Sequence, residues 1–236
     1  MRHVISISQR KGGVGKTTVA VCLSAELRAR GYDTALIDGD PQRSASQWAE
    51  PGKLGFPVHA IALDDRPVGA WAQAVQDVEA ACVVIDTAPS DRALGAAIAL
   101  ADLVIIPCTP SGLDLEATAR TLEIVNAVRV RRNGIPHLIL APNRVDARTL
   151  EGQQLADELK AFNEHVSPPI GDRTAFVRAF SDGQAMSGAS SGRAAYEEIR
   201  SFCDFVESIF AAGQPGPRMG SGVAAVASVK ATTGKI

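Results

Sequence analysis

The chain has 236 residues, 46% of them hydrophobic and 21% charged, which is enough apolar material for a substantial core. Its formal net charge of −2 excludes nucleic-acid binding through an overall basic field, so any such binding must use a local patch. The four cysteines form no C-x-x-C pair, the N-terminus reads as a strand and not a signal peptide, and no apolar run approaches the ~20 residues that span a bilayer, so we expect a cytoplasmic protein in a reducing compartment.

Strand and helix signals alternate along most of the chain. Short, continuously apolar runs predict buried strands at residues 3–8, 34–38, 58–61, 82–86, 103–107 and 137–141. Helical spacing of apolar residues predicts helices at residues 17–30, 68–79, 93–101, 113–132, 150–163, 174–181 and 193–211. Strands separated by helices imply right-handed βαβ units, so we expect an α/β fold: a mostly parallel, twisted sheet with helices on both faces.

The domain organisation follows from a change of composition near the C-terminus. Residues 1–212 are expected to form one domain, and residues 213–236 read GQPGPRMGSGVAAVASVKATTGKI. This segment is rich in small residues and has no periodicity, which predicts a disordered tail. The last predicted helix, 193–211, has one apolar stripe and an acidic polar face, so we expect it to pack on the sheet and not to bind a membrane.

The stretch QRKGGVGKTT, residues 9–18, lies between the first predicted strand and the first predicted helix. This is the setting of a phosphate-binding loop, where backbone N–H groups and a helix N-terminus meet anionic oxygens. The loop departs from the usual G-x-x-x-x-G-K-[ST] pattern, because Arg10 occupies the first glycine position and Lys11 adds a second cation. Lys16 is expected to bridge the β- and γ-phosphates of a nucleotide, and the Thr17 hydroxyl to ligate Mg²⁺.

Three aspartates stand at the ends of predicted strands. Asp38 and Asp40 follow TALI, and Asp86 follows CVVI. The carboxyl ends of parallel strands meet at one edge of the sheet, where the phosphate-binding loop also lies, so these side chains can converge on the metal and the γ-phosphate. Asp86 suits an outer-shell Mg²⁺ partner, and one carboxylate of the first pair could orient the attacking water. The alternative is that strand-end aspartates only cap helices.

These motifs together resemble the ParA/MinD family of P-loop ATPases with a deviant Walker A loop. KGGVGKTT resembles that loop with its signature lysine, and IDGDPQRSASQW resembles the D-x-D-P-Q motif that follows it. CVVIDTAPSD resembles the Walker B strand, although Ala88 replaces a usual proline. ADLVIIPCTPSGLDLEA and LAPNRVDART resemble later segments, so the resemblance covers residues 2–211. The arginine at position 10 favours ParA over MinD. The loop begins near residue 9, without an extension for a helix-turn-helix domain, which resembles the small partition ATPases.

The resemblance implies a set of site residues. Nucleotide binding is implied for Lys11, Gly12, Gly13, Val14, Gly15, Lys16, Thr17, Thr18 and Asn143. Catalytic roles are implied for Lys11, Lys16 and Asp40, and magnesium contacts for Thr17, Asp38 and Asp86. In this family the signature lysine is thought to reach the partner's nucleotide in an ATP-bound dimer. Residues 143–146, N-R-V-D, also resemble the N-K-x-D guanine signature, but the wider resemblance favours ATP.

The implied function is a slow, partner-stimulated ATPase that uses ATP and Mg²⁺. Its ATP-bound homodimer is expected to bind DNA without sequence preference, and candidate contacts are Arg173, Arg178, Arg193 and Arg200. A ParB-like or other adaptor would couple it to a plasmid, a chromosome origin or a protein complex on the nucleoid. The alternatives are a MinD-like membrane-associated positioning ATPase and a P-loop enzyme that shares the loop. Metal-cluster carriers of the superfamily need paired cysteines, which this sequence lacks.

Overall fold

The computed structural model describes residues 2–186 and 192–212, and the tail predicted at 213–236 lies outside the described residues. Its centre is a seven-stranded sheet in the order β3-β2-β4-β1-β5-β6-β7. Every registered pair of neighbouring strands is parallel, which confirms the predicted α/β fold class. The strands are β1 (His3–Ile7), β2 (Thr34–Gly39), β3 (Val58–Ala60), β4 (Cys82–Thr87), β5 (Leu103–Cys108), β6 (His137–Pro142) and β7 (His165–Val166).

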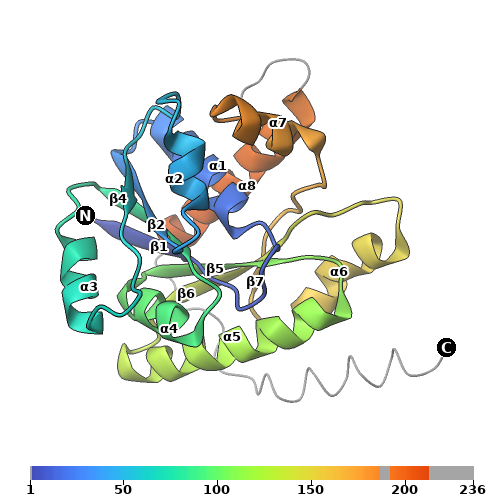
Figure 1. Cartoon of the computed structure of the whole chain (residues 1–236). Coiled ribbons are helices and arrows are strands. Elements are labelled where there is room, and N and C mark those ends of the chain that lie inside the picture. Colours follow the sequence, from blue (N-terminus) through green and yellow to red (C-terminus); the bar gives the residue numbers. More distant parts are fainter. Residues whose placement is uncertain (1, 187–191, 213–236) are drawn as a thin grey trace.

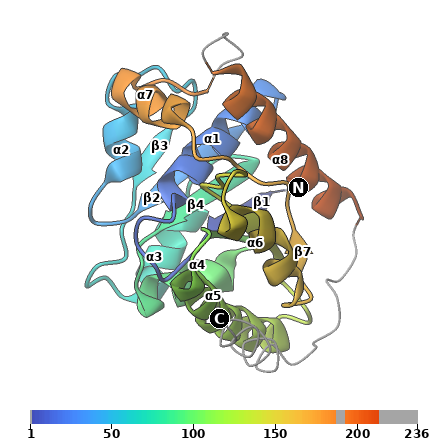
Figure 2. The ribbon, with the colours of Figure 1, turned by 90° about the vertical axis from the view of Figure 1, so that its right-hand side faces the viewer.

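Helices cover both faces of this sheet (Figures 1 and 2). They are α1 (Lys16–Ala29), α2 (Ser44–Ala49), α3 (Val68–Gln76), α4 (Asp91–Leu100), α5 (Gly112–Arg131), α6 (Leu150–Lys160), α7 (Thr174–Asp182) and α8 (Arg193–Ala212). The core is correspondingly divided. One apolar cluster joins the sheet to α1, α2 and α8, and two others join it to α3, α4, α5 and α6.

The strands alternate between these clusters residue by residue. In β5, Leu103 and Ile105 face the α1 side, whereas Val104 and Ile106 face the α5 side. All four side chains are fully buried, which explains why the strand reads as an unbroken apolar run. The parallel arrangement also places the strand-to-helix loops at one edge of the sheet, and the phosphate-binding loop is among them.

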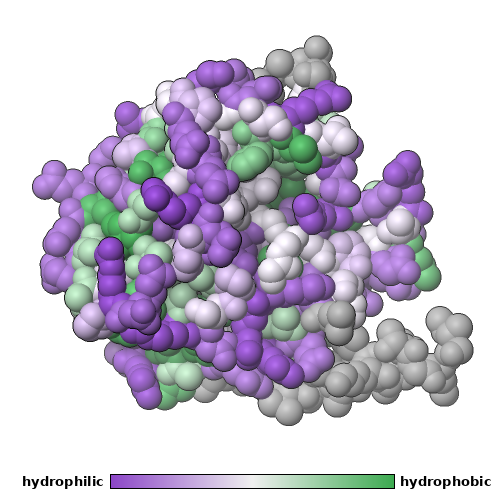
Figure 3. Space-filling model, in the orientation of Figure 1, coloured by the Kyte–Doolittle hydropathy of each residue, from purple (hydrophilic) through white to green (hydrophobic). Residues whose placement is uncertain are grey.

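The last helix, α8, uses its apolar stripe inside the protein. Phe202, Cys203 and Val206 are fully buried in the cluster that contains α1. None of the described helices is long and apolar enough to cross a membrane. On the face shown in Figure 3, a small apolar patch lies over α7, where Val177 and Phe180 are exposed.

Candidate functional site

The loop between β1 and α1 has the backbone of an anion cradle. Gly13 and Gly15 take positive φ angles of 77° and 89°, which favour glycine over residues with a Cβ. Gly15 is the N-cap of α1, and no side chain caps this end of the helix. The helix N-terminus therefore carries partial positive charge toward the loop, and no described side chain caps its first amides.

Lys16 lies at the base of this cradle. It is 7% exposed, and its Nζ donates to the Lys11 carbonyl at 3.2 Å. Burial lowers the pKa of Lys16, while the nearby carboxylates of Asp86 and Asp40 act in the opposite direction. A buried cation with one neutral acceptor is an electrostatic partner for an anion in the loop.

Asp86 follows β4 into the same region. The Thr17 hydroxyl donates to Asp86 Oδ2 at 2.6 Å, whereas the buried Asp86 Oδ1 has no hydrogen-bond partner among the residues that the structure describes. The pKa of Asp86 is raised to about 7, mainly by burial; the Thr17 hydroxyl and Lys16 act to lower it, and the carboxylates of Asp38 and Asp40 act to raise it. An unpartnered carboxylate oxygen beside a threonine hydroxyl fits hydrated Mg²⁺, which keeps several waters and takes few protein ligands. Among residues 2–186 and 192–212, no three His, Cys, Asp or Glu side chains group as a metal site.

The other two aspartates bond to the loop that leads into α2. Asp38 pairs with Asp86 across β2 and β4, and its Oδ2 accepts from both the amide and the hydroxyl of Ser46 at 2.7 Å. Asp38 thus anchors the first turn of α2. Asp40 lies at the sheet edge and accepts from the Gln42 amide at 2.9 Å. The structure brings all three aspartates to one edge, as the strand order requires.

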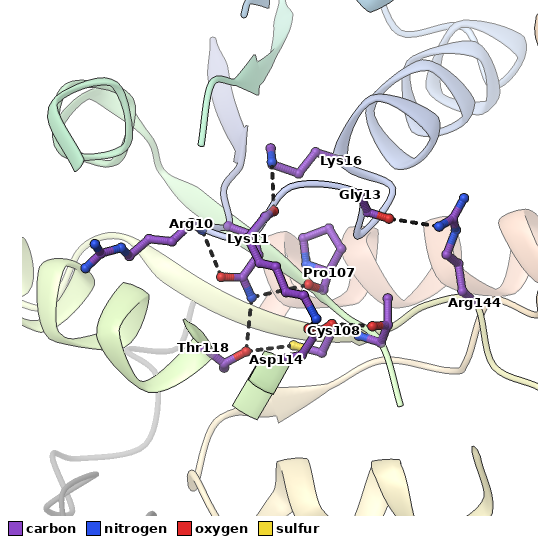
Figure 4. Close-up of polar contacts among 11 residues, drawn as sticks. Arg10, Lys11, Gly13, Lys16, Pro107, Cys108, Asp114, Thr118 and Arg144 are labelled. Atoms are coloured by element: carbon purple, nitrogen blue, oxygen red, sulfur yellow. Dashed lines mark hydrogen bonds and ion pairs between the residues drawn. The ribbon is translucent and has the colours of Figure 1, made fainter. Parts of the chain in front are cut away.

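The two additional cations of the loop pair with the first turns of two helices. Lys11 Nζ contacts the carboxylate of Asp114 in α5, and this carboxylate is fully buried (Figure 4). Asp114 Oδ2 also accepts from the Thr109 amide at 3.0 Å. Arg10 Nε lies 3.0 Å from Asp91 Oδ1 in α4. Neither partner can be predicted from the sequence, because an acidic residue in a first helical turn is also common without any role in a site.

A cavity of about 290 Å³ adjoins the loop. Asn143, at the end of β6, lies in its wall and donates from Nδ2 to the Val14 carbonyl at 2.6 Å. The cavity is lined by Gly15, Thr17, Thr18, Ser44, Trp48, Asn143, Arg144, Gly171, Asp172, Arg173, Phe176, Val177 and Phe180. A glycine-rich loop at one end and aromatic side chains at the other suit a ligand with phosphates and a flat ring.

The N-R-V-D aspartate lies outside this wall. Asp146 borders a neighbouring cavity of about 540 Å³. Arg148 binds its carboxylate through Nε at 2.9 Å and Nη2 at 2.8 Å. The hydrogen bonds from Arg148 lower the pKa of Asp146 to about 2. Asp146 is thus held by Arg148 and is not among the residues that line the cavity beside the phosphate-binding loop.

The candidate DNA-binding arginines lie on α7, on α8 and just before α7. Three of them pair with carboxylates: Arg173 with Glu198 at 2.6 Å, Arg193 with Glu197 at 2.9 Å and Arg200 with Glu26 at 3.8 Å. Arg178 is exposed, and no carboxylate within the described parts of the chain forms an ion pair with it.

Comparison with known proteins agrees with this geometry. Residues 5–186 match the family model of the CobQ/CobB/MinD/ParA nucleotide binding domain. The chain is 30% identical over 188 residues to Protein ParA of Rhizobium radiobacter, covering 76% of this chain and 83% of the relative. It is 35% identical over 183 residues to the maintenance of carboxysome distribution protein A of Gloeobacter kilaueensis, covering 75% and 77%. A plasmid partition protein of Borrelia burgdorferi bound to AMPPNP shares the fold, with a TM-score of 0.67 at 22% identity over 88% of this chain and 100% of the other.

The parallel sheet with helices on both faces and the loop between β1 and α1 define a P-loop nucleotide-binding protein. The chain belongs to the ParA/MinD family of partition ATPases, which confirms the resemblance seen in its motifs.

Proposed function

We propose that this protein is an ATP-dependent, dimerising ParA-type ATPase that positions a cargo along DNA. The observation that carries the proposal is the second lysine of the phosphate-binding loop, Lys11, held by a buried carboxylate beside the cradle. A lysine in this place can move from Asp114 to the phosphates of a nucleotide in a facing subunit. Binding of ATP and association of two chains then depend on each other.

The site residues divide the work of hydrolysis. Bound Mg²⁺ would supply charge neutralisation for the β- and γ-phosphates. Lys16 and the amides of residues 12–18 would hold the phosphate oxygens, and Thr17 and Asp86 would hold the hydrated ion. Asp40 orients the attacking water, and Lys11 stabilises the charge of the transition state from the partner subunit.

DNA is the proposed track. Only the dimer presents two copies of the arginines on and near α7 and α8, so DNA affinity rises when ATP joins the subunits. An adaptor, of the ParB type or specific to another cargo, stimulates hydrolysis and releases the dimer. The cargo is a plasmid, a chromosome origin or a protein complex, in keeping with relatives named for plasmid partition and carboxysome distribution.

We take residues 1–212 as the ATPase domain and expect the protein on the nucleoid. The predicted tail, 213–236, lies outside the described residues. Membrane positioning is the less favoured role, because the apolar stripe of α8 is already buried against the core.

The test is binding to random-sequence duplex DNA with ADP, with ATP and with a slowly hydrolysed ATP analogue, across salt concentration. Tight binding only in the ATP states, weakening steeply with salt, is the expected result. The oligomeric state is measured in the same samples by light scattering. An ATP-bound dimer that binds no DNA in any state would remove DNA as the track and direct the search to lipid vesicles.

A further inference from the structure

We infer that Arg144 is a positioning residue for the phosphate-binding loop, acting with Asn143 to aim two of its amides at the nucleotide. The inference rests on the proposed nucleotide-binding function and concerns the two residues that follow β6. Arg144 Nη1 donates to the Gly13 carbonyl at 2.9 Å, and Asn143 Nδ2 donates to the Val14 carbonyl at 2.6 Å. Figure 4 shows the guanidinium of Arg144 directed at Gly13.

The backbone around Arg144 is built for this contact. Arg144 takes a left-handed conformation with φ of 53°, which is disfavoured for a residue with a Cβ. Both neighbours fix it. The Asn143 amide donates to the Cys108 carbonyl at 2.8 Å, and the Val145 amide donates to the Ile170 carbonyl at 3.0 Å. The chain therefore turns at Arg144 between two anchored residues, and its side chain projects toward the loop.

The geometry of the peptide bond gives the two contacts a consequence. In a trans peptide the carbonyl and the following N–H point in opposite directions. When Arg144 holds the Gly13 carbonyl away from the phosphate position, the Val14 N–H therefore points toward it. When Asn143 holds the Val14 carbonyl in the same way, the Gly15 N–H points toward the phosphates. These are amides of the cradle that meets phosphate oxygens.

The loop needs such restraint because of its own composition. Glycines in the left-handed region can rotate their peptide planes at small cost, so an unrestrained cradle would populate orientations that present carbonyls to the phosphates. The fit to the clamp is close: a Cβ on Gly15 would lie 2.4 Å from Asn143 Nδ2. Asn143 is buried and donates to the loop from the protein interior, whereas Arg144 is exposed and donates to it from the protein surface.

The experiment compares Arg144→Ala, Arg144→Lys and Arg148→Ala with the wild type. Arg148 lies in the same connection and 89% of its side chain is exposed, so Arg148→Ala removes the same charge nearby without touching the loop. Affinities for Mg-ADP and Mg-ATP are measured with fluorescent analogues, together with kcat, KM and the melting temperature.

We expect Arg144→Ala to weaken both nucleotides equally, by about tenfold, as loss of one charge-assisted hydrogen bond predicts. The amides hold the phosphates alike in the ground and transition states, so KM rises while kcat at saturating ATP stays within about threefold. Arg144→Lys keeps one donor and restores most of the affinity. A purely structural role would lower the melting temperature without this split between KM and kcat.

Three results would overturn the inference: wild-type affinity in Arg144→Ala, equal weakening in Arg148→Ala, or no recovery in Arg144→Lys. If the wild-type chain itself binds neither nucleotide, the proposed function fails and the inference fails with it. Wild-type binding that is unchanged in Arg144→Ala defeats the inference alone.

Discussion

At the scale of single residues, Asp86 combines a cost to folding with a use in the site. Its Oδ1 is buried and accepts no hydrogen bond from any described part of the chain. Asp86→Asn removes that charge, so we expect the melting temperature without nucleotide to rise by a few degrees, since about 1 kcal/mol corresponds to roughly 2–4 °C in a chain of this size. The measurement is a thermal melt at pH 8, where the carboxyl is ionised, with and without Mg-ATP. The added Mg-ATP should stabilise the wild type much more than the variant.

The matched control for Asp86→Asn is Asp157→Asn. Asp157 is 80% exposed and pairs with Lys160 one helical turn away, so the same change there should leave the melting temperature within about a degree. A lower melting temperature in Asp86→Asn would contradict the assignment of a folding cost to this carboxylate.

Lys11 has a structural and a proposed catalytic role that can be separated. Asp114 has no exposed side-chain surface, so Lys11→Ala leaves a buried carboxylate whose remaining partner, within residues 2–186 and 192–212, is Thr109. We expect that variant to lose about 1–3 kcal/mol of stability in urea denaturation as well as its hydrolysis. The double variant Lys11→Ala with Asp114→Asn should recover stability but not hydrolysis. A double variant no more stable than Lys11→Ala would show that the ion pair does not carry the loss.

At the scale of elements, α2 contacts both Asp38, near the end of β2, and α7. Ser46 is bonded to Asp38, and Trp48 Nε1 donates to the Gln184 carbonyl at 3.0 Å. The Trp48 ring also meets Phe180 edge to face, with centroids 5.4 Å apart. A change at the nucleotide can thus move α2 and α7 together.

Trp48 offers a direct measurement of that connection, because it lines the cavity next to the phosphate-binding loop. The second tryptophan, Trp71, lies in α3 and is buried in a separate cluster. We expect Mg-ATP to change the tryptophan emission of Trp71→Phe, which keeps Trp48, and to leave that of Trp48→Phe unchanged. The opposite pattern would place the nucleotide away from this cavity.

The same elements show how far sequence could predict the fold. The bounds of strands β4 and β5 could be predicted to within one residue, because a strand buried on both faces consists of consecutive apolar residues. Helix α2 was missed, since six residues lie below any periodic signal and depend on Asp38 and Trp48 contacts. The phosphate-binding loop could be predicted from its sequence, whereas the partners of Lys11 and Arg10 could not, because they come from the first turns of α5 and α4, which only the folded sheet brings next to the loop.

At the scale of the whole molecule, the parallel sheet gathers the loops after β1, β2, β4, β5 and β6 at one edge. Asp91 in α4 and Asp114 in α5 each take a cation of the phosphate-binding loop, so helices from the opposite face of the sheet are tied to the nucleotide site. A change in the loop therefore reaches both layers of the protein.

The proposed DNA-binding surface can be tested by its salt dependence. Arg178 is the exposed arginine of α7, whereas Arg193 pairs with Glu197 in its own helix. Each phosphate contact contributes about 0.9 to the slope of log affinity against log salt, and a dimer presents two copies of Arg178. Arg178→Ala should therefore reduce the slope by up to about 2 in the ATP state, and affinity should fall alike for all DNA sequences.

Arg193→Ala is the matched control and should change the slope less, because its guanidinium already has a carboxylate partner. Dimerisation and ATP turnover without DNA should be the same in both variants, since neither arginine lies in the phosphate-binding loop. An unchanged slope in an Arg178→Ala dimer would exclude α7 from the DNA surface. The slope tests the role of Arg178 better than the affinity alone. The slope reports the number of phosphate contacts, whereas the apparent affinity also falls when part of the protein is unfolded.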